Sequence, residues 1–119
     1  MNIITPLIQF QQQLRIFHWQ TDLYAAHEAF GGAYESMDKL IDSFVEEYMG
    51  SFGRSKPTTI FSIELKPLQN DTIVNNVLDD FLLYLEDMNR EIPKETNLLN
   101  IRDEMMGVVR KLKYLLTLK

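Results

Sequence analysis

Few side chains in this sequence are able to do chemistry. It contains no cysteine and only two histidines, His18 and His27. The lack of cysteine excludes disulfides, thiolate metal ligands and a cysteine nucleophile. Metal binding by imidazole and carboxylate groups is therefore the main chemistry to consider.

A row of carboxylates follows His27 in a segment with helical periodicity. Asp38, Asp42 and Glu46 are four residues apart, and Glu35 lies beside them on the same flank. Like charges at this spacing destabilise a helix by roughly 0.2–0.5 kcal/mol per pair, which a cation would relieve. Oxygen and imidazole ligands suit iron, manganese or zinc. The alternative is a solvated acidic face beside two structural histidines.

Two consecutive glycines, Gly31 and Gly32, interrupt the same segment. Each costs roughly 1 kcal/mol relative to alanine inside a helix. Such a pair indicates that another backbone approaches closely or that the helix bends. A contact between copies of the chain is one such approach.

Four segments with helical periodicity must position these residues. The first opens at Thr5-Pro6, a cap residue followed by proline, and ends near Thr21. The second covers residues 22–49 and stops at Gly50. Its apolar stripe is Leu23, Ala26, Phe30, Ala33, Met37, Leu40 and Phe44.

The third helix is predicted from an Asp71 cap to Pro93, and the fourth from about Thr96. Residues 51–70 break the helical period and contain Pro57 and Pro67. Twenty residues reach at most ~66 Å, which exceeds the ~42 Å of a 28-residue helix. We therefore expect residues 1–119 to form one all-α domain, a ferritin-like four-helix bundle with one long crossover between helices 2 and 3.

Composition narrows the function classes. Hydrophobic residues make up 45% and charged residues 24%, as in ordinary globular proteins. No apolar run approaches the ~18 residues of a membrane span, and we predict a cytoplasmic protein without membrane contact. The net charge of -5 argues against nucleic-acid binding. The basic residues Arg110, Lys111, Lys113 and Lys119 instead complement the dipole of the last helix.

The stretch from Phe17 to Tyr48 resembles the first two helices of the Dps-type miniferritins. His18-Trp19 matches the His-Trp pair that ends the first helix of that family, and His27-Glu28 matches the His-Glu pair that opens the second. Asp42 and Glu46 follow His27 by 15 and 19 residues, as in the family. The resemblance implies a homo-oligomer with a two-fold contact along helix 2. Iron would bind His18 and His27 of one subunit and Asp42 and Glu46 of another.

Two departures from that family bear on catalysis. The interval between the histidines is three residues shorter, which a tighter loop would absorb. Gly31 stands where a bridging carboxylate is expected, which leaves open whether the chain has ferroxidase activity. The Glu-x-x-His motif of ordinary ferritins is absent, because Arg15 and Tyr24 precede the histidines by three residues.

Two other hypotheses stand beside iron binding. The last segment resembles the ends of small helical proteins of tailed phages, which implies a non-catalytic structural or interaction protein in the host cytoplasm. A helical nucleotide pyrophosphohydrolase would use paired acidic motifs to hold magnesium. Glu35-Ser36-Met37-Asp38 matches such a motif only in part, and the third helix supplies no companion.

Overall fold

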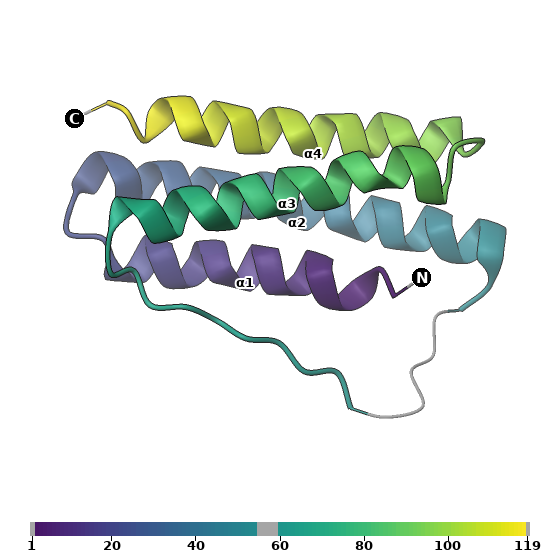
Figure 1. The fold of residues 1–119 in the computed structure, drawn as a ribbon, viewed down its shortest axis with the longest axis horizontal. Helices are drawn as coiled ribbons and strands as arrows, with labels where there is room; N and C mark the ends of the chain where they lie inside the picture. Colours follow the sequence, from purple (N-terminus) through teal and green to yellow (C-terminus); the bar gives the residue numbers. More distant parts are fainter. Residues whose placement is uncertain (1, 55–59, 119) are drawn as a thin grey trace.

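The four predicted helices are α1 (Ile4–Gln20), α2 (Tyr24–Phe52), α3 (Asp71–Glu91) and α4 (Thr96–Leu115) (Figure 1). The computed structural model describes residues 2–54 and 60–118, so Pro57 and Lys119 lie outside the described residues. Within these residues no strand accompanies the helices. The prediction of an all-helical four-helix bundle is confirmed.

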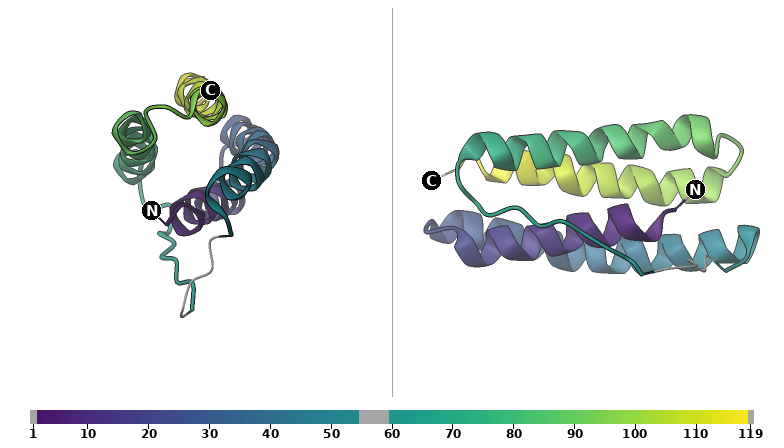
Figure 2. Two further views of the ribbon diagram at one scale, coloured as in Figure 1. Left: turned by 90° about the vertical axis from the view of Figure 1, so that its right-hand side faces the viewer. Right: turned by 60° about the horizontal axis from the view of Figure 1, so that its bottom comes forward.

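The connection between α2 and α3 gives the bundle its topology. A three-residue turn makes α1 and α2 antiparallel, and residues 60–70 of the crossover return along the bundle beside α1 (Figures 1 and 2). The helix α3 therefore starts at the same end of the bundle as α2 and runs parallel to it. Among the described residues α2 contacts α1 and α4 but not α3, so α2 and α3 are diagonal neighbours. The expected long crossover is present.

Three of the predicted helix boundaries are wrong by a few residues. Helix α1 begins at Ile4, where the side chain of Asn2 accepts hydrogen bonds from the first backbone amides, so Thr5 is not the cap. Helix α2 continues through Gly50 to Phe52 and is capped by Gly53, whose φ of +84° is readily adopted only by glycine. The cap of α3 is Asn70, whose side-chain oxygen accepts from the amide of Ile73.

The apolar stripes of the four helices meet in one core. The bulkiest fully buried side chains include Phe17 of α1, Phe30 and Phe44 of α2, Leu78 of α3 and Met105 of α4. Leu23 was predicted in the α2 stripe but lies in the α1–α2 turn and is exposed. The buried guanidinium of Arg102 donates to the carbonyl of Leu85 and to the side chain of Asn89, which fastens α4 to α3.

Candidate functional site

The two histidines lie against each other across the α1–α2 turn. Their imidazole rings are stacked with centroids 3.8 Å apart and planes 16° from parallel. The Nδ1 atom of His18 lies 2.7 Å from the carbonyl oxygen of His27, and Nδ1 of His27 lies 2.8 Å from the carbonyl oxygen of His18. The pair thus closes the turn with two reciprocal hydrogen bonds.

These hydrogen bonds fix where the protons sit. A carbonyl oxygen only accepts, so each Nδ1 must carry the proton and donate it. In a neutral ring Nε2 is then the atom with a free lone pair. A histidine that donates from Nδ1 to a carbonyl is also the usual arrangement of a metal-ligating histidine. The arrangement therefore serves the turn and leaves one nitrogen of each ring available.

Gly31 has a clear role in this arrangement. A Cβ atom added at Gly31 would lie 2.9 Å from Cε1 of His18, closer than real Cβ contacts, and 3.1 Å from its Nδ1, tighter than most of them. The approach expected at the glycine pair is thus made by a side chain of α1 in the same chain. A Cβ at Gly32 would meet nothing within 4 Å. A carboxylate side chain at position 31 would have to enter the space that the His18 ring occupies.

The carboxylates of α2 do not join the histidines within one chain. Asp42 and Glu46 follow His27 by 15 and 19 residues on one helix, so they lie about 22 and 28 Å further along its axis. Both are exposed, and Asp38 accepts a hydrogen bond from Gln11 of α1. Across residues 2–54 and 60–118, no cluster of three or more histidine, aspartate or glutamate side chains is placed to hold a metal ion.

A feature that sequence reasoning missed is how α1 holds the crossover. Glutamine side chains of α1 accept hydrogen bonds from alternate backbone amides of the crossover: Gln9 from Glu64 at 3.1 Å, Gln13 from Lys66 at 2.7 Å and Gln20 from Leu68 at 2.6 Å. Gln13 also donates to the carbonyl oxygen of Lys66 at 2.8 Å. Four residues of a helix rise about 6 Å and two residues of an extended chain about 6.6 Å. The step from Gln9 to Gln13 therefore matches the step from Glu64 to Lys66. The only sequence signal for this attachment is that Gln9, Gln13 and Gln20 lie among the several glutamines of α1.

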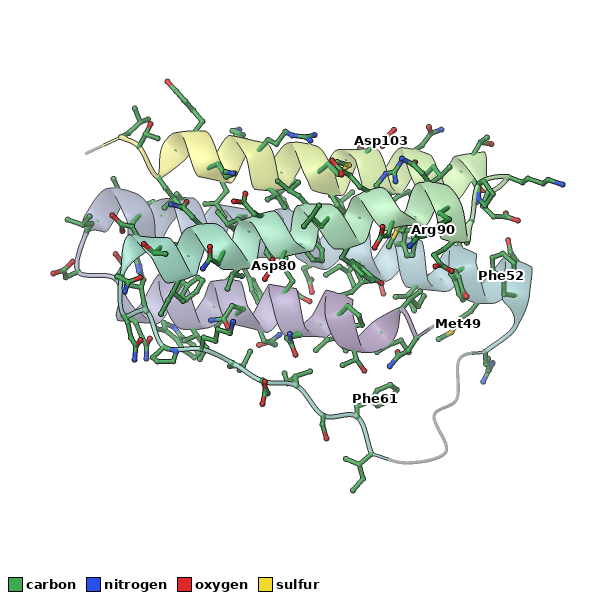
Figure 3. The ribbon with its side chains drawn as sticks, viewed as in Figure 1. Met49, Phe52, Phe61, Asp80, Arg90 and Asp103 are labelled. Carbon is green, nitrogen blue, oxygen red and sulfur yellow. The ribbon has the colours of Figure 1, made fainter. Side chains whose placement is uncertain are left out.

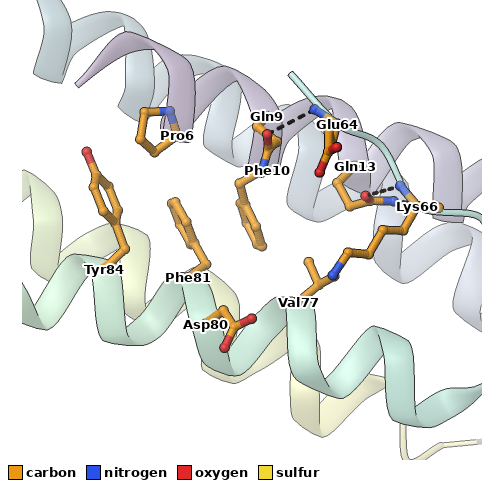
Figure 4. A pocket seen from close by; sticks show the side chains of 10 residues that line it. All are labelled: Pro6, Gln9, Phe10, Gln13, Glu64, Lys66, Val77, Asp80, Phe81 and Tyr84. Carbon is orange, nitrogen blue, oxygen red and sulfur yellow. Dashed lines mark hydrogen bonds between the residues drawn. The ribbon is translucent and has the colours of Figure 1, made fainter. Parts of the chain in front are cut away.

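This attachment borders a groove of about 190 Å³ between α1 and α3. Its floor is the pair of Phe10 and Phe81, whose rings are stacked with centroids 3.8 Å apart, and the side chains of Glu64 and Lys66 lie at its rim (Figure 4). The hydroxyl of Tyr84, also in the lining, is buried without a hydrogen-bond partner among the described residues. Burial, and secondarily Tyr48, raises the pKa of that hydroxyl above its ordinary value of 10.0.

None of the helices in the described part of the chain is both long and apolar enough to cross a membrane. The expectation that no helix spans a membrane is confirmed for those residues. The fold and the turn together define a four-helix bundle with one long crossover, in which paired histidines hold α1 against α2.

Comparison with known proteins gives the family. The chain belongs to DUF5856, described as a family of unknown function, whose sequence pattern matches residues 18–116. It is 26% identical over 113 residues to an uncharacterised 14.6 kDa protein from the mobD-ri intergenic region of Enterobacteria phage T4, covering 95% of this chain and 84% of that protein. No solved structure matches the chain. The looser resemblance to small phage proteins is confirmed, whereas the Dps-type resemblance finds no support.

Proposed function

We propose that this chain is a non-catalytic structural or interaction protein of a tailed phage. One observation carries the proposal. The two histidines expected to bind iron serve the α1–α2 turn, where His18 and His27 each donate a hydrogen bond to the other's backbone carbonyl. Gly31 makes room for the ring of His18 in place of a carboxylate. The bundle is thereby stabilised at the position where ferroxidase chemistry would occur.

The comparisons support the same proposal. The T4 relative covers nearly the whole chain, so the resemblance extends over all four helices and not only over the histidine segment. We expect the protein to act in the cytoplasm of the bacterial host, which rests on that relative alone. We also propose that residues 1–119 fold as one unit, since α4 contacts both α2 and α3.

Iron binding between subunits is a second proposal, favoured by one observation. In both histidines Nδ1 donates to a carbonyl, which leaves Nε2 of a neutral ring free to bind a metal, as in metal-ligating histidines. Because Asp42 and Glu46 are too far along α2 to reach the same ion, they would have to come from a second copy. This site needs a homo-oligomer with a two-fold contact along α2. In this proposal the bundle has the ferritin-like topology with one long crossover, and two subunits share each iron ion.

Iron(II) titration distinguishes the two proposals. Metal-free protein is titrated anaerobically and in air near neutral pH, with binding followed calorimetrically and oxidation followed by absorbance. The non-catalytic proposal expects no saturable binding and no oxidation above the rate in buffer. Saturable binding that is lost in Asp42→Asn but retained in Glu35→Gln would overturn it and support the shared site. Glu35 is the matched control because it is an exposed acid of the same helix outside the proposed ligand set.

A further inference from the structure

The crossover has a free edge opposite to the one that α1 holds. The amides of Glu64, Lys66 and Leu68 bond to glutamines of α1, so this edge of the extended segment is occupied. In an extended chain the backbone groups of alternate residues point to opposite sides. The N–H and C=O groups of Ile63 and Leu65 therefore point away from α1. Within residues 60–70 neither of these two amides makes a hydrogen bond to the described part of the protein.

The side chains of the same segment are strongly apolar. Glu64 and Lys66 turn toward the groove between α1 and α3 (Figure 4), so Phe61, Ile63 and Leu65 lie on the opposite face. These three side chains are 44%, 36% and 40% exposed, and Ile60 is 88% exposed. Phe61 lies on the crossover outside the four helices (Figure 3). An exposed apolar edge with unpaired backbone groups is a surface to which another extended segment adds.

We propose that a second copy of this chain pairs with the crossover, as an antiparallel strand related by a two-fold axis through Ile63. In this register Phe61 faces Leu65 of the second copy, and Ile63 faces its own equivalent. Each of these residues directs its backbone groups outward, so each facing pair exchanges two hydrogen bonds. Ser62 then faces Glu64 of the second copy, and no like charges are opposed.

The sequence disfavours several of the other registers. An axis through Glu64 would place two carboxylates directly opposite each other, which is unfavourable. An axis through Leu65 would place Ile63 opposite Pro67, which has no N–H to donate. An axis between two residues would oppose outward-facing backbone groups with inward-facing ones. The register with its axis through Ile63 avoids each of these conflicts, and this self-complementarity favours a second copy over an unrelated strand.

This contact is separate from the two-fold contact along α2 and does not depend on iron. It uses residues 61–65, whereas the proposed iron ligands lie in α1 and α2. The iron titration can therefore fail or succeed without bearing on the strand pairing. If both contacts form, the chains assemble beyond a dimer.

Disulfide trapping tests the register, because the natural sequence has no cysteine. The Cα atoms of a hydrogen-bonded antiparallel pair are about 5.5 Å apart, within the range for a disulfide. We expect the Ile63→Cys variant to form a disulfide-linked dimer under mild oxidation about ten-fold or more faster than Leu65→Cys. In the proposed register the two copies of residue 65 are about 13 Å apart, beyond disulfide reach. Equal rates for the two variants, or no dimer from Ile63→Cys, would overturn the proposal.

A proline pair in the Ile63→Cys background provides the control. Leu65→Pro removes an outward amide and should slow the disulfide several-fold. Ser62→Pro removes an amide that points inward and makes no hydrogen bond to the described part of the protein, so its rate should match that of the parent variant. Equal slowing by both prolines would show that chain stiffness and not strand pairing controls the rate. Circular dichroism of each variant checks that the helices are retained.

Discussion

The ring of His18 occupies the space directly over the α-carbon of Gly31. The atoms Cε1 and Nδ1 of that ring would lie 2.9 and 3.1 Å from a Cβ at position 31. The ring cannot move aside freely, because its Nδ1 is bonded to the carbonyl of His27 and its face is stacked on the His27 ring. A single glycine thus permits α1 and α2 to approach at the turn.

Gly31→Ala should destabilise the protein by about 1 kcal/mol. Overpacking typically costs about 1–3 kcal/mol, and the gain in helix propensity returns about 1 kcal/mol. Gly32→Ala is the matched control, since a Cβ there meets nothing within 4 Å, and should stabilise by up to about 1 kcal/mol. Urea denaturation measures both. Coupling is tested with His18→Ala, in whose background Gly31→Ala should no longer destabilise. If the two glycines respond alike, the packing role of Gly31 is wrong.

The same geometry predicts that Gly31→Asp does not create a working iron site. The larger side chain meets the His18 ring at its first atom, so the expected result is a greater loss of stability than for Gly31→Ala. Iron(II) affinity and oxidation rate should remain those of the natural protein. Calorimetric titration of folded variant at low temperature separates the two effects. An increase in iron affinity would show that the His18 ring moves and that the site is a degraded ferroxidase.

The tautomers of the two histidines are a direct test of the turn. Each neutral ring should carry its proton on Nδ1, because each Nδ1 donates to a carbonyl. Nitrogen-15 NMR of the imidazoles reports the tautomer of each ring. His27→Ala removes one donor and the stacked ring, and should cost about 1–2 kcal/mol. Rings that report the Nε2–H form would contradict the reciprocal bonding.

The sequence was sufficient for the helices but not for the roles of the residues between them. The spacing of Phe30, Met37 and Phe44 predicts a buried face whatever the neighbours are, and these side chains are buried. The end of α2 was misplaced because Gly50 and Gly53 look alike in sequence, and only the backbone of Gly53 has positive φ. The prediction that His18 and His27 bind a metal stays a prediction. Their mutual bonding depends on a three-residue turn, which no helical period specifies.

Tyr84→Phe should stabilise the protein by about 1 kcal/mol. The hydroxyl of Tyr84 is buried without a partner among the described residues, so its removal loses no hydrogen bond there. Burial raises the pKa of this hydroxyl above 10.0, the value expected in the unfolded chain. Above pH 10 the unfolded state therefore loses its proton first, and stability falls as pH rises.

The pH dependence of stability provides a second test of the Tyr84 prediction. The natural protein should lose stability between pH 10 and 11 more steeply than Tyr84→Phe, as measured by thermal melts at each pH. Tyr114→Phe changes an exposed tyrosine and should leave the slope unchanged. If Tyr84→Phe is instead destabilising and its alkaline slope matches that of the natural protein, the hydroxyl has a partner in solution.

Gln13→Glu should detach the crossover from α1 although the two side chains have nearly the same shape. The Gln13 amide is buried and both accepts from the amide and donates to the carbonyl of Lys66. A glutamate can accept but cannot donate, and its charge would be buried beside a carbonyl oxygen, which costs about 1–3 kcal/mol. Gln12→Glu is the control, because Gln12 is half-buried and its side chain donates to the hydroxyl of Tyr34 of α2 and not to the crossover. Hydrogen exchange at the Lys66 amide should accelerate in Gln13→Glu alone, and equal protection in both variants would show that the crossover is held by other contacts.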